Sequence, residues 1–265
     1  MNKRAGGLMT DCSTVTKAKL ITHFIAGYPD LESSYETALG LIDGGAYALE
    51  MQIPFSDPSA DGPVIELACR KALEKGFRVS DGFRLIERIR EYRDIPVYLM
   101  SYSGIVYNMG VNRFVSKAAS SGVSGLIIPD LVPGADEGLY AAGRKAGINV
   151  VPVVVPGVPE QRLIEIMAEK PEWVYLALRS GITGSYTKLG EENLGFLDRV
   201  REYGVKVMAG FGIKTPEQIN TLRPHCDAVI AGSFIVKQVS VAYNEGSESF
   251  SVSDAAADAV RYLLA

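Results

Sequence analysis

The chain has 265 residues with 27 basic and 31 acidic side chains, so its formal net charge at neutral pH is −4. Apolar residues make up 47% and charged residues 22% of the chain, which is typical of folded globular proteins and excludes a disordered one. The mild acidity argues against a nucleic-acid binder, which needs a basic face. No run of about 18 apolar residues predicts a membrane span, so neither nucleic acid nor membrane is an expected partner.

Cysteine and histidine are both scarce. Cys12, Cys69 and Cys226 are too few and too widely spaced for a disulfide framework or a metal-binding cysteine pair. We expect them to be free thiols in a cytoplasmic protein, and no apolar segment of a secretory signal follows the N-terminus. His23 and His225 are too far apart to form a helical ligand pair, so no metal site is expected.

Short β-branched runs alternate with amphipathic segments along the chain. Most of the runs are continuously apolar, which is typical of parallel strands buried on both faces. The predicted strands cover residues 20–26, 47–51, 95–101, 124–129, 148–154, 173–177, 205–209 and 227–231. The clearest helical patterns cover residues 33–43, 64–75, 81–92, 112–121, 160–170, 216–222 and 254–264.

Eight strands with about 33 residues per strand–helix unit favour a closed (β/α)8 TIM barrel over an open sheet. We expect a single barrel domain over residues 1–265. Two helical patterns fit between residues 51 and 95, which predicts an extra helix after the second strand. Residues 1–18 predict an N-terminal helix or arm, and the polar stretch 244–251 predicts a loop before the last helix.

The active site of such a barrel lies at the carboxyl ends of the strands. Glu50 lies inside the apolar second strand, on the face opposite Leu49 and Met51. A carboxylate in a barrel lumen is costly unless it is paired or protonated, so Glu50 is either catalytic or part of a structural ion pair. Asp61 follows on a Pro/Gly-rich loop, where it either contributes to the chemistry or caps the next helix, before Pro63.

Glycines follow the last two predicted strands, at Gly210, Gly212 and Gly232, and Ser233 comes next. Glycine lets backbone N–H groups approach an anion. Glycine-containing loops after the last two strands of a barrel are typical of a phosphate site. The alternative is that these glycines only form tight turns. The loop over residues 179–190 carries three glycines and is long, which is typical of a lid, although a passive surface loop has the same pattern.

Several blocks of the chain resemble the tryptophan synthase alpha chain family, over about residues 21–236. The matching blocks are Glu50, Pro54-Phe55-Ser56-Asp57-Pro58, Ala60-Asp61-Gly62-Pro63, residues 179–184, Gly210-Phe211-Gly212-Ile213, Thr215-Pro216-Glu217-Gln218 and Gly232-Ser233. The resemblance implies a lyase without a cofactor, which cleaves indole-3-glycerol phosphate by a retro-aldol reaction to indole and glyceraldehyde 3-phosphate. It also implies a beta chain partner that carries pyridoxal phosphate, in an α2β2 hetero-oligomer.

The resemblance further implies a role for individual residues. Glu50 would be the acid and base at the reacting carbon and hydroxyl, and Asp61 would accept a hydrogen bond from the indole N–H. The implied substrate-binding residues are Tyr175 in the pocket, Thr183 in the lid, Gly184, Gly212, Gly232 and Ser233 at the phosphate, and Phe211 with residues 126–128 as apolar walls.

Three loops depart from the family pattern. Gln52 stands where the family usually has a small glycine, and Gly104 stands where it usually has a polar side chain. Residues 155–158 differ from the usual sequence after the fifth strand. The loops after strands 2 and 3 face the beta chain in the family, so we place Gln52, Pro54, Asp57 and Gly104 at the partner interface.

Two alternatives to the lyase remain open. One is another phosphate-binding barrel, such as an isomerase or the synthase that closes the indole ring, although the first three predicted strands end without the lysines that this synthase would need. The other is a barrel subunit that mainly activates a beta partner, with weak or lost lyase activity.

Overall fold

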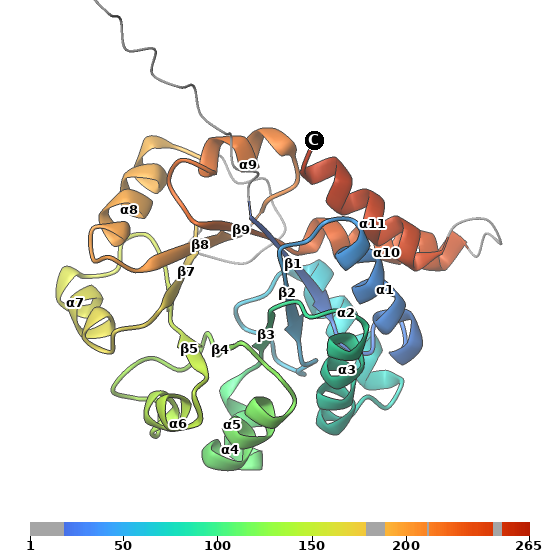
Figure 1. The fold of residues 1–265 in the computed structure, drawn as a ribbon, viewed down its shortest axis with the longest axis horizontal. Helices are drawn as coiled ribbons and strands as arrows, with labels where there is room; N and C mark the ends of the chain where they lie inside the picture. The colour runs from blue at the N-terminus through green and yellow to red at the C-terminus, as the bar shows by residue number, and fades with distance from the viewer. Residues whose placement is uncertain (1–18, 179–188, 211, 246–250) are drawn as a thin grey trace, which may run out of the picture.

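The computed structural model describes residues 19–178, 189–210, 212–245 and 251–265. Within them, nine strands form one parallel sheet: β1 (Leu20–Ile25), β2 (Ala48–Gln52), β3 (Val97–Met100), β4 (Gly125–Ile127), β5 (Asn149–Val151), β6 (Val153–Val154), β7 (Trp173–Ala177), β8 (Lys206–Gly210) and β9 (Ala228–Ala231). The strand order β5-β4-β3-β2-β1-β9-β8-β7-β6 curls around a central axis, and the helices surround it (Figure 1).

The fifth predicted strand, residues 148–154, is interrupted. Pro152 separates β5 from β6, because proline has no N–H to donate to a sheet ladder. β5 pairs with β4 and β6 pairs with β7, while the Pro152 carbonyl still accepts a hydrogen bond from the Tyr175 N–H at 2.9 Å. The predicted (β/α)8 barrel is therefore confirmed, with its fifth strand in two pieces.

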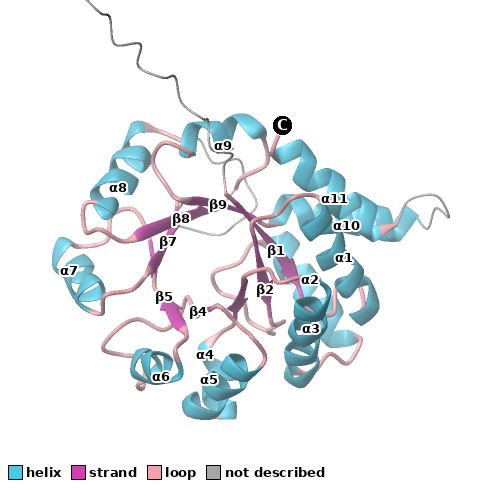
Figure 2. Ribbon diagram, in the orientation of Figure 1, coloured by secondary structure: helices cyan, strands magenta, loops and turns pink. Residues whose placement is uncertain are grey.

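Helices cover the outside of the barrel (Figure 2). They are α1 (Leu31–Asp43), α2 (Pro63–Glu74), α3 (Val79–Tyr92), α4 (Ser103–Met109), α5 (Val111–Ser120), α6 (Leu139–Ala146), α7 (Glu160–Ala168), α8 (Glu191–Arg201), α9 (Pro216–Leu222), α10 (Ser233–Glu245) and α11 (Val252–Leu263). Both α2 and α3 lie between β2 and β3, which confirms the extra helix. None of the helices in the described residues is long and apolar enough to cross a membrane.

The sequence patterns missed four helices, α4, α6, α8 and α10. The first two have seven and eight residues, too few for a clear 3.6-residue period, and α8 carries a glycine in its interior. α10 extends to Glu245, into the start of the predicted loop 244–251. Residues 246–250 of that loop and the predicted N-terminal element, residues 1–18, lie outside the described residues.

Side chains alternate between the two faces of the strands. Inward residues such as Ile21, Tyr98 and Met208 form an apolar cluster that fills the lumen. Outward residues such as Leu49 and Val174 pack against the helices in a larger cluster. Because both faces are buried, every inward position near the carboxyl ends either packs or lines a site.

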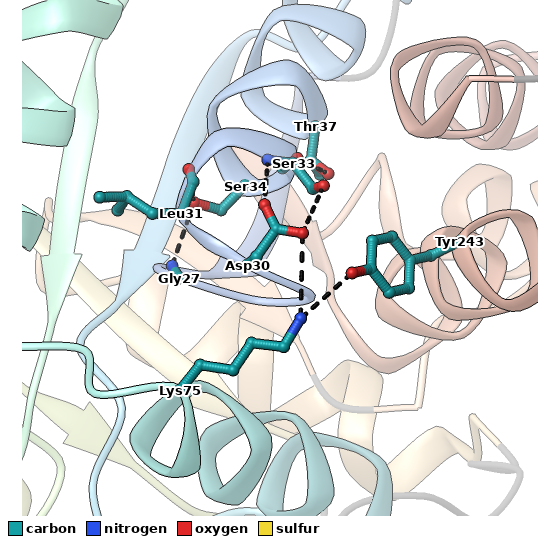
Figure 3. Close-up of polar contacts among 8 residues, drawn as sticks. All are labelled: Gly27, Asp30, Leu31, Ser33, Ser34, Thr37, Lys75 and Tyr243. Carbon is teal, nitrogen blue, oxygen red and sulfur yellow. Dashed lines mark hydrogen bonds and ion pairs between the residues drawn. The ribbon is translucent and has the colours of Figure 1, made fainter.

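A polar cluster fixes the loop between β1 and α1 at the rim of the barrel (Figure 3). Asp30 caps α1 by accepting a hydrogen bond from the Ser33 N–H at 2.8 Å, and the Ser34 hydroxyl accepts one from the Gly27 N–H at 3.0 Å. Lys75, at the end of α2, lies 3.9 Å from the Asp30 carboxylate and donates to the Tyr243 hydroxyl of α10 at 3.1 Å. The loop is thus tied to two other helices.

Replacing Gly40 by alanine is expected to destabilise the fold, because α1 packs directly on α11 at this residue. A Cβ at Gly40 would lie 2.0 Å from the Ser253 carbonyl oxygen, and the backbone cannot move aside as a side-chain end could. The free energy of unfolding should fall by about 1–3 kcal/mol or more in urea denaturation. Gly195→Ala in α8 is the control: its Cβ meets nothing within 4 Å, so it should stabilise by up to about 1 kcal/mol. Equal effects of the two substitutions would contradict the packing described here.

Candidate active site

A cavity of about 440 Å³ lies at the carboxyl ends of the strands. It is lined by His23, Glu50, Ser59, Ala60, Asp61, Ile65, Met100, Ile127, Pro129, Val153, Val155, Tyr175, Ala177, Gly212, Ile230, Gly232 and Ser233. Most of these are apolar or small, and the few polar groups are concentrated on β1, β2 and the loops after β2 and β9. A mostly apolar cavity with a few convergent polar groups is typical of a small-molecule site.

Glu50 lies in this cavity and is paired with a histidine. The register of β1 and β2 places His23 directly beside Glu50, and both side chains point inward. The His23 Nδ1 and the Glu50 Oε1 are 3.0 Å apart, and the two residues are only 6% and 2% exposed. Burial lowers the pKa of His23, but the charge and hydrogen bond of Glu50 outweigh it and raise this pKa above its usual value.

Asp61 lies on the loop after β2 and is held by two donors. Its Oδ2 accepts a hydrogen bond from the Gln52 amide at 2.7 Å and one from the Tyr102 hydroxyl at 2.8 Å. Burial raises the pKa of Asp61, although His23 and the two hydrogen bonds oppose the shift. Helix α2 is capped by the backbone at Gly62 without a side-chain bond, so Asp61 does not serve as its N-cap.

Tyr102 stabilises the same loop from β3. It is fully buried, its ring stacks on Phe55 with centroids 5.3 Å apart, and its hydroxyl accepts a hydrogen bond from the Ala60 N–H at 3.2 Å. Burial and the nearby Asp61 carboxylate raise its pKa, so the hydroxyl stays protonated and donates to Asp61. This residue therefore ties the Pro/Gly-rich loop to the barrel wall at two points.

Another part of the cavity lining comes from the glycine-containing segments after β8 and β9. Gly232 and Ser233 lie at the start of α10, and the Gly232 carbonyl accepts the helical hydrogen bond from the Val236 N–H at 3.0 Å. Gly212 has φ +78°, in the left-handed region that favours glycine, and its carbonyl accepts a hydrogen bond from the buried Gln218 amide at 3.1 Å. A helix N-terminus beside glycine loops has the geometry that anions bind.

The structure brings most of the predicted site residues together. Those that line the cavity are Glu50, Asp61, Tyr175, Gly212, Gly232 and Ser233. The predicted apolar wall at residues 126–128 is only partly correct: Ile127 faces the lumen, whereas Leu126 and Ile128 pack outward against the helices because side chains alternate along β4. The predicted residues Thr183, Gly184 and Phe211 lie outside the described residues.

Two residues predicted for the partner interface are placed elsewhere. Gln52 is 0% exposed and its amide points inward to Asp61, because it shares the inward face of β2 with Glu50. Pro54 is also buried. The prediction that these two contact a partner is wrong for this conformation. Asp57 and Gly104 are exposed, and their place at an interface stays a prediction.

Sequence reasoning missed His23, Tyr102 and the inward role of Gln52. The sequence did contain a signal for His23 and Gln52, since each is a polar residue in an apolar strand. The alternation of side chains between the two strand faces places both on the inward face, where a site residue is expected. Tyr102 lies two residues after the end of β3, where barrel site residues gather. In the described part of the chain, no three His, Cys, Asp or Glu side chains gather where they could hold a metal ion.

One cavity of this (β/α)8 barrel holds the buried Glu50, the partly buried Asp61 and glycines beside a helix start. These features define the class as a barrel enzyme of acid–base chemistry. The family described as tryptophan synthase alpha chain matches residues 9–260. The chain is 36% identical to the tryptophan synthase alpha chain of Helicobacter hepaticus over 235 residues, which cover 86% of this chain and 88% of that one. It is 38% identical to that of Methanothermobacter thermautotrophicus over 218 residues, covering 82% and 81%.

Solved structures agree with the sequence relatives. A chain of the tryptophan synthase α2β2 complex of Pyrococcus furiosus has a TM-score of 0.84 at 31% identity, covering 94% of this chain and 98% of that one. A chain of Mycobacterium tuberculosis tryptophan synthase has a TM-score of 0.80 at 30% identity, covering 92% and 93%. The protein belongs to the tryptophan synthase alpha chain family.

Asp61→Asn is expected to stabilise the protein more at pH 8 than at pH 4. Since burial raises the pKa of Asp61, folding favours its protonated form. Wild-type stability is therefore lost as pH rises from the ordinary value of about 4 through the raised one, and the neutral amide avoids this loss. The gain at pH 8 should be about 1 kcal/mol in thermal or urea unfolding. Asp57→Asn, on the same loop but exposed, controls for the lost loop charge. A gain for Asp61→Asn that is equal at both pH values would contradict the burial cost.

Proposed function

We propose that this protein is the alpha subunit of a tryptophan synthase, which cleaves indole-3-glycerol phosphate to indole and glyceraldehyde 3-phosphate. The observation that carries the proposal is the placement of Glu50 and Asp61 in one mostly apolar cavity that is also lined by the glycine-containing start of α10. Family membership supports the same reaction. The reaction needs acid–base groups and an anion site, and in this proposal the chain itself uses no cofactor.

Glu50 is the proposed acid and base. In the retro-aldol step the indole carbon 3 gains a proton, the side-chain hydroxyl loses one, and the carbon–carbon bond between them breaks to leave an aldehyde. A single carboxyl group can give a proton to the carbon and take one from the oxygen. The number of protons on the enzyme is then unchanged, and no second acid is needed. The rigid position of Glu50 within β2 favours this double role, because both proton transfers need the same short reach.

Asp61 is the proposed partner of the indole ring nitrogen. When carbon 3 is protonated, positive charge develops on the ring nitrogen, and a carboxylate that accepts its N–H stabilises this charge. Gln52 and Tyr102 both bind the Oδ2 of Asp61, which leaves Oδ1 as the oxygen for this contact. Apolar residues such as Met100 and Ile127 then supply the walls for a flat aromatic ring.

The phosphate is proposed to bind at Gly212, Gly232 and Ser233, where backbone N–H groups and the dipole of α10 favour an anion. Tyr175, on β7, also lines the cavity, and burial raises its pKa well above the usual value, so it stays protonated. Thr183 and Gly184 are proposed to complete the site from the lid, and Phe211 to add to its apolar wall.

The protein is proposed to work with a beta chain in a cytoplasmic α2β2 assembly, with pyridoxal phosphate in the beta chain. The Pyrococcus furiosus neighbour comes from a tryptophan synthase α2β2 complex for which mutual activation is described. Asp57 and Gly104 are the proposed contacts, because both are exposed, Asp57 on the loop after β2 and Gly104 in the first turn of α4 after β3. The same two segments hold Asp61 and Tyr102, so a partner bound there would act directly on the order of the site.

Turnover of indole-3-glycerol phosphate by the isolated chain, and again with a beta chain added, tests the proposal. Indole formation in either assay supports the lyase. If no indole forms in either one while the beta reaction from added indole accelerates, the chain is an activator subunit only and the proposed cleavage is wrong.

Glu50→Gln is expected to lower kcat for cleavage by at least ~10² to 10⁴, because an amide of the same shape cannot exchange protons. KM and the far-UV spectrum should change little, since the amide fills the same space beside His23. Glu74→Gln, an exposed residue of α2, is the control and should keep wild-type kcat. Near wild-type turnover by Glu50→Gln would show that Glu50 is a structural partner of His23.

Gly232→Asp is expected to raise KM and to weaken binding of inorganic phosphate in parallel, because its carboxylate would face the phosphate site. A Cβ at this position already lies 3.1 Å from the His23 Cβ, so Gly232→Ala is needed to separate bulk from charge. The alanine variant should lose less phosphate affinity than the aspartate variant in calorimetric titration. Unchanged phosphate affinity in Gly232→Asp would place the phosphate elsewhere.

A further inference from the structure

His23 is buried beside the proposed reacting carboxyl group but has no part in the chemistry given so far. β1 and β2 are paired in parallel, and His23 is the residue that the register sets opposite Glu50. Their 3.0 Å contact joins Nδ1 to Oε1 within the cavity wall. Neither residue lies on a loop, so the contact is set by the sheet itself.

The remaining polar atoms of the pair are unusual for a purely structural contact. Among the described residues, neither the Nε2 of His23 nor the Oε2 of Glu50 has a hydrogen-bond partner, and both atoms are buried. Buried polar atoms without a partner are costly, and in native proteins they concentrate where a ligand completes them. His23 is thus the only hydrogen-bond partner of the Glu50 carboxyl in the described structure.

The imidazole ring is also fixed on its other side. A Cβ built on Gly232 would lie 3.1 Å from the Cβ of His23 and 3.2 Å from its Cγ and Cδ2. The imidazole ring is therefore in close contact with Gly232 at the start of α10. Any larger residue at that position would clash with the ring. This contact links the proposed phosphate end of the cavity to the orientation of Glu50.

The charged and titratable groups around His23 come from three sides. Glu50 faces it from β2, and Asp61 acts on it from the following loop. Tyr175 on β7 and Tyr102 after β3 lie near the same carboxylates, and both stay protonated. From β9 and the start of α10 the cavity-lining residues, Ile230, Gly232 and Ser233, carry no charge.

We propose that His23 is a positioning residue for Glu50, and this inference rests on the proposed function. The protonated imidazole donates from Nδ1 to Oε1, holds the carboxylate in one orientation and leaves Oε2 to exchange the proton with the substrate. The proton taken from the hydroxyl and the proton given to carbon 3 both pass through Oε2. His23 keeps its own proton throughout, so no further acid or base is needed.

The consequence is a dependence on the charge of His23. When the imidazolium loses its proton at high pH, the charge that orients Glu50 disappears and kcat should fall. The limb of the pH–rate profile at high pH therefore reports the loss of the His23 proton.

The pair can be tested without any assay of activity. The chain contains only two histidines, so an NMR titration of the imidazole signals resolves each, and His225→Asn assigns them. In the wild type His23 should titrate above the ordinary value of about 6.5, and in Glu50→Gln its midpoint should fall, because the charge and hydrogen bond that raise this pKa are removed. The His225 signal, from an exposed pair with Asp198, should not move between the two proteins. An unchanged His23 midpoint in Glu50→Gln would overturn the proposal.

Kinetics of two substitutions then test the positioning role. His23→Phe keeps the ring and removes the donor, so kcat should fall roughly 10- to 100-fold while KM changes little. His23→Asn places an amide N–H near the former Nδ1 but carries no charge, so it should recover only part of the lost kcat at pH 7. Its profile should lack the high-pH limb, because the amide does not titrate.

Two outcomes would reject the role. Wild-type kcat and an unchanged pH profile in His23→Phe would make His23 a packing residue, even if the variant unfolds at a lower temperature. Equal losses of kcat in both variants would show that a hydrogen-bond donor at this position does not restore the orientation of Glu50, and would reject the positioning role. If the wild type forms no indole with or without a beta chain, the proposed function fails, and the NMR titration then decides by itself whether His23 and Glu50 are coupled.

Discussion

Closing a parallel sheet on itself buries both of its faces, and the rest of this structure depends on that constraint. An inward side chain on a barrel strand has no access to bulk water, so it must either pack with its neighbours or find a polar partner. Most inward residues pack, as Ile21 and Met208 do. Glu50 and Gln52 are the polar exceptions on β2, and for Glu50 the strand register supplies the partner, His23. In the candidate site, therefore, some of the inward side chains are paired polar groups instead of packed apolar ones.

The two acidic groups are held in different ways, and this difference suits different roles. Glu50 is fixed within a strand by one neighbouring histidine, which gives it a rigid position. Asp61 lies on a loop and is fixed by donors from β2 and from the residue after β3, Gln52 and Tyr102. Its position therefore depends on loops that also carry the exposed Asp57 and Gly104. A partner on those loops would influence Asp61 far more than Glu50.

The sequence was sufficient for the architecture because the dominant signals were local. Continuously apolar runs marked the parallel strands, and their spacing of about 33 residues per unit marked a closed barrel. The long interval before β3 marked the extra helix, and the polar exception in β2 marked Glu50. Short helices such as α4 and α6 escaped, because their stability comes from packing on the barrel and not from their own periodicity.

By itself, then, the sequence determined the barrel, the end of it that carries the site, and the family's pattern of acids and glycines. Only the tertiary structure decided which polar side chains meet. Gln52, His23 and Tyr102 lie on three different strands or strand ends, far apart in the chain, and their contacts depend on register and on which face of a strand points inward. Gln52 shows the reason most clearly: beside a loop in the sequence it suggested a surface contact, but the two-residue alternation of β2 directs it to Asp61 inside the barrel.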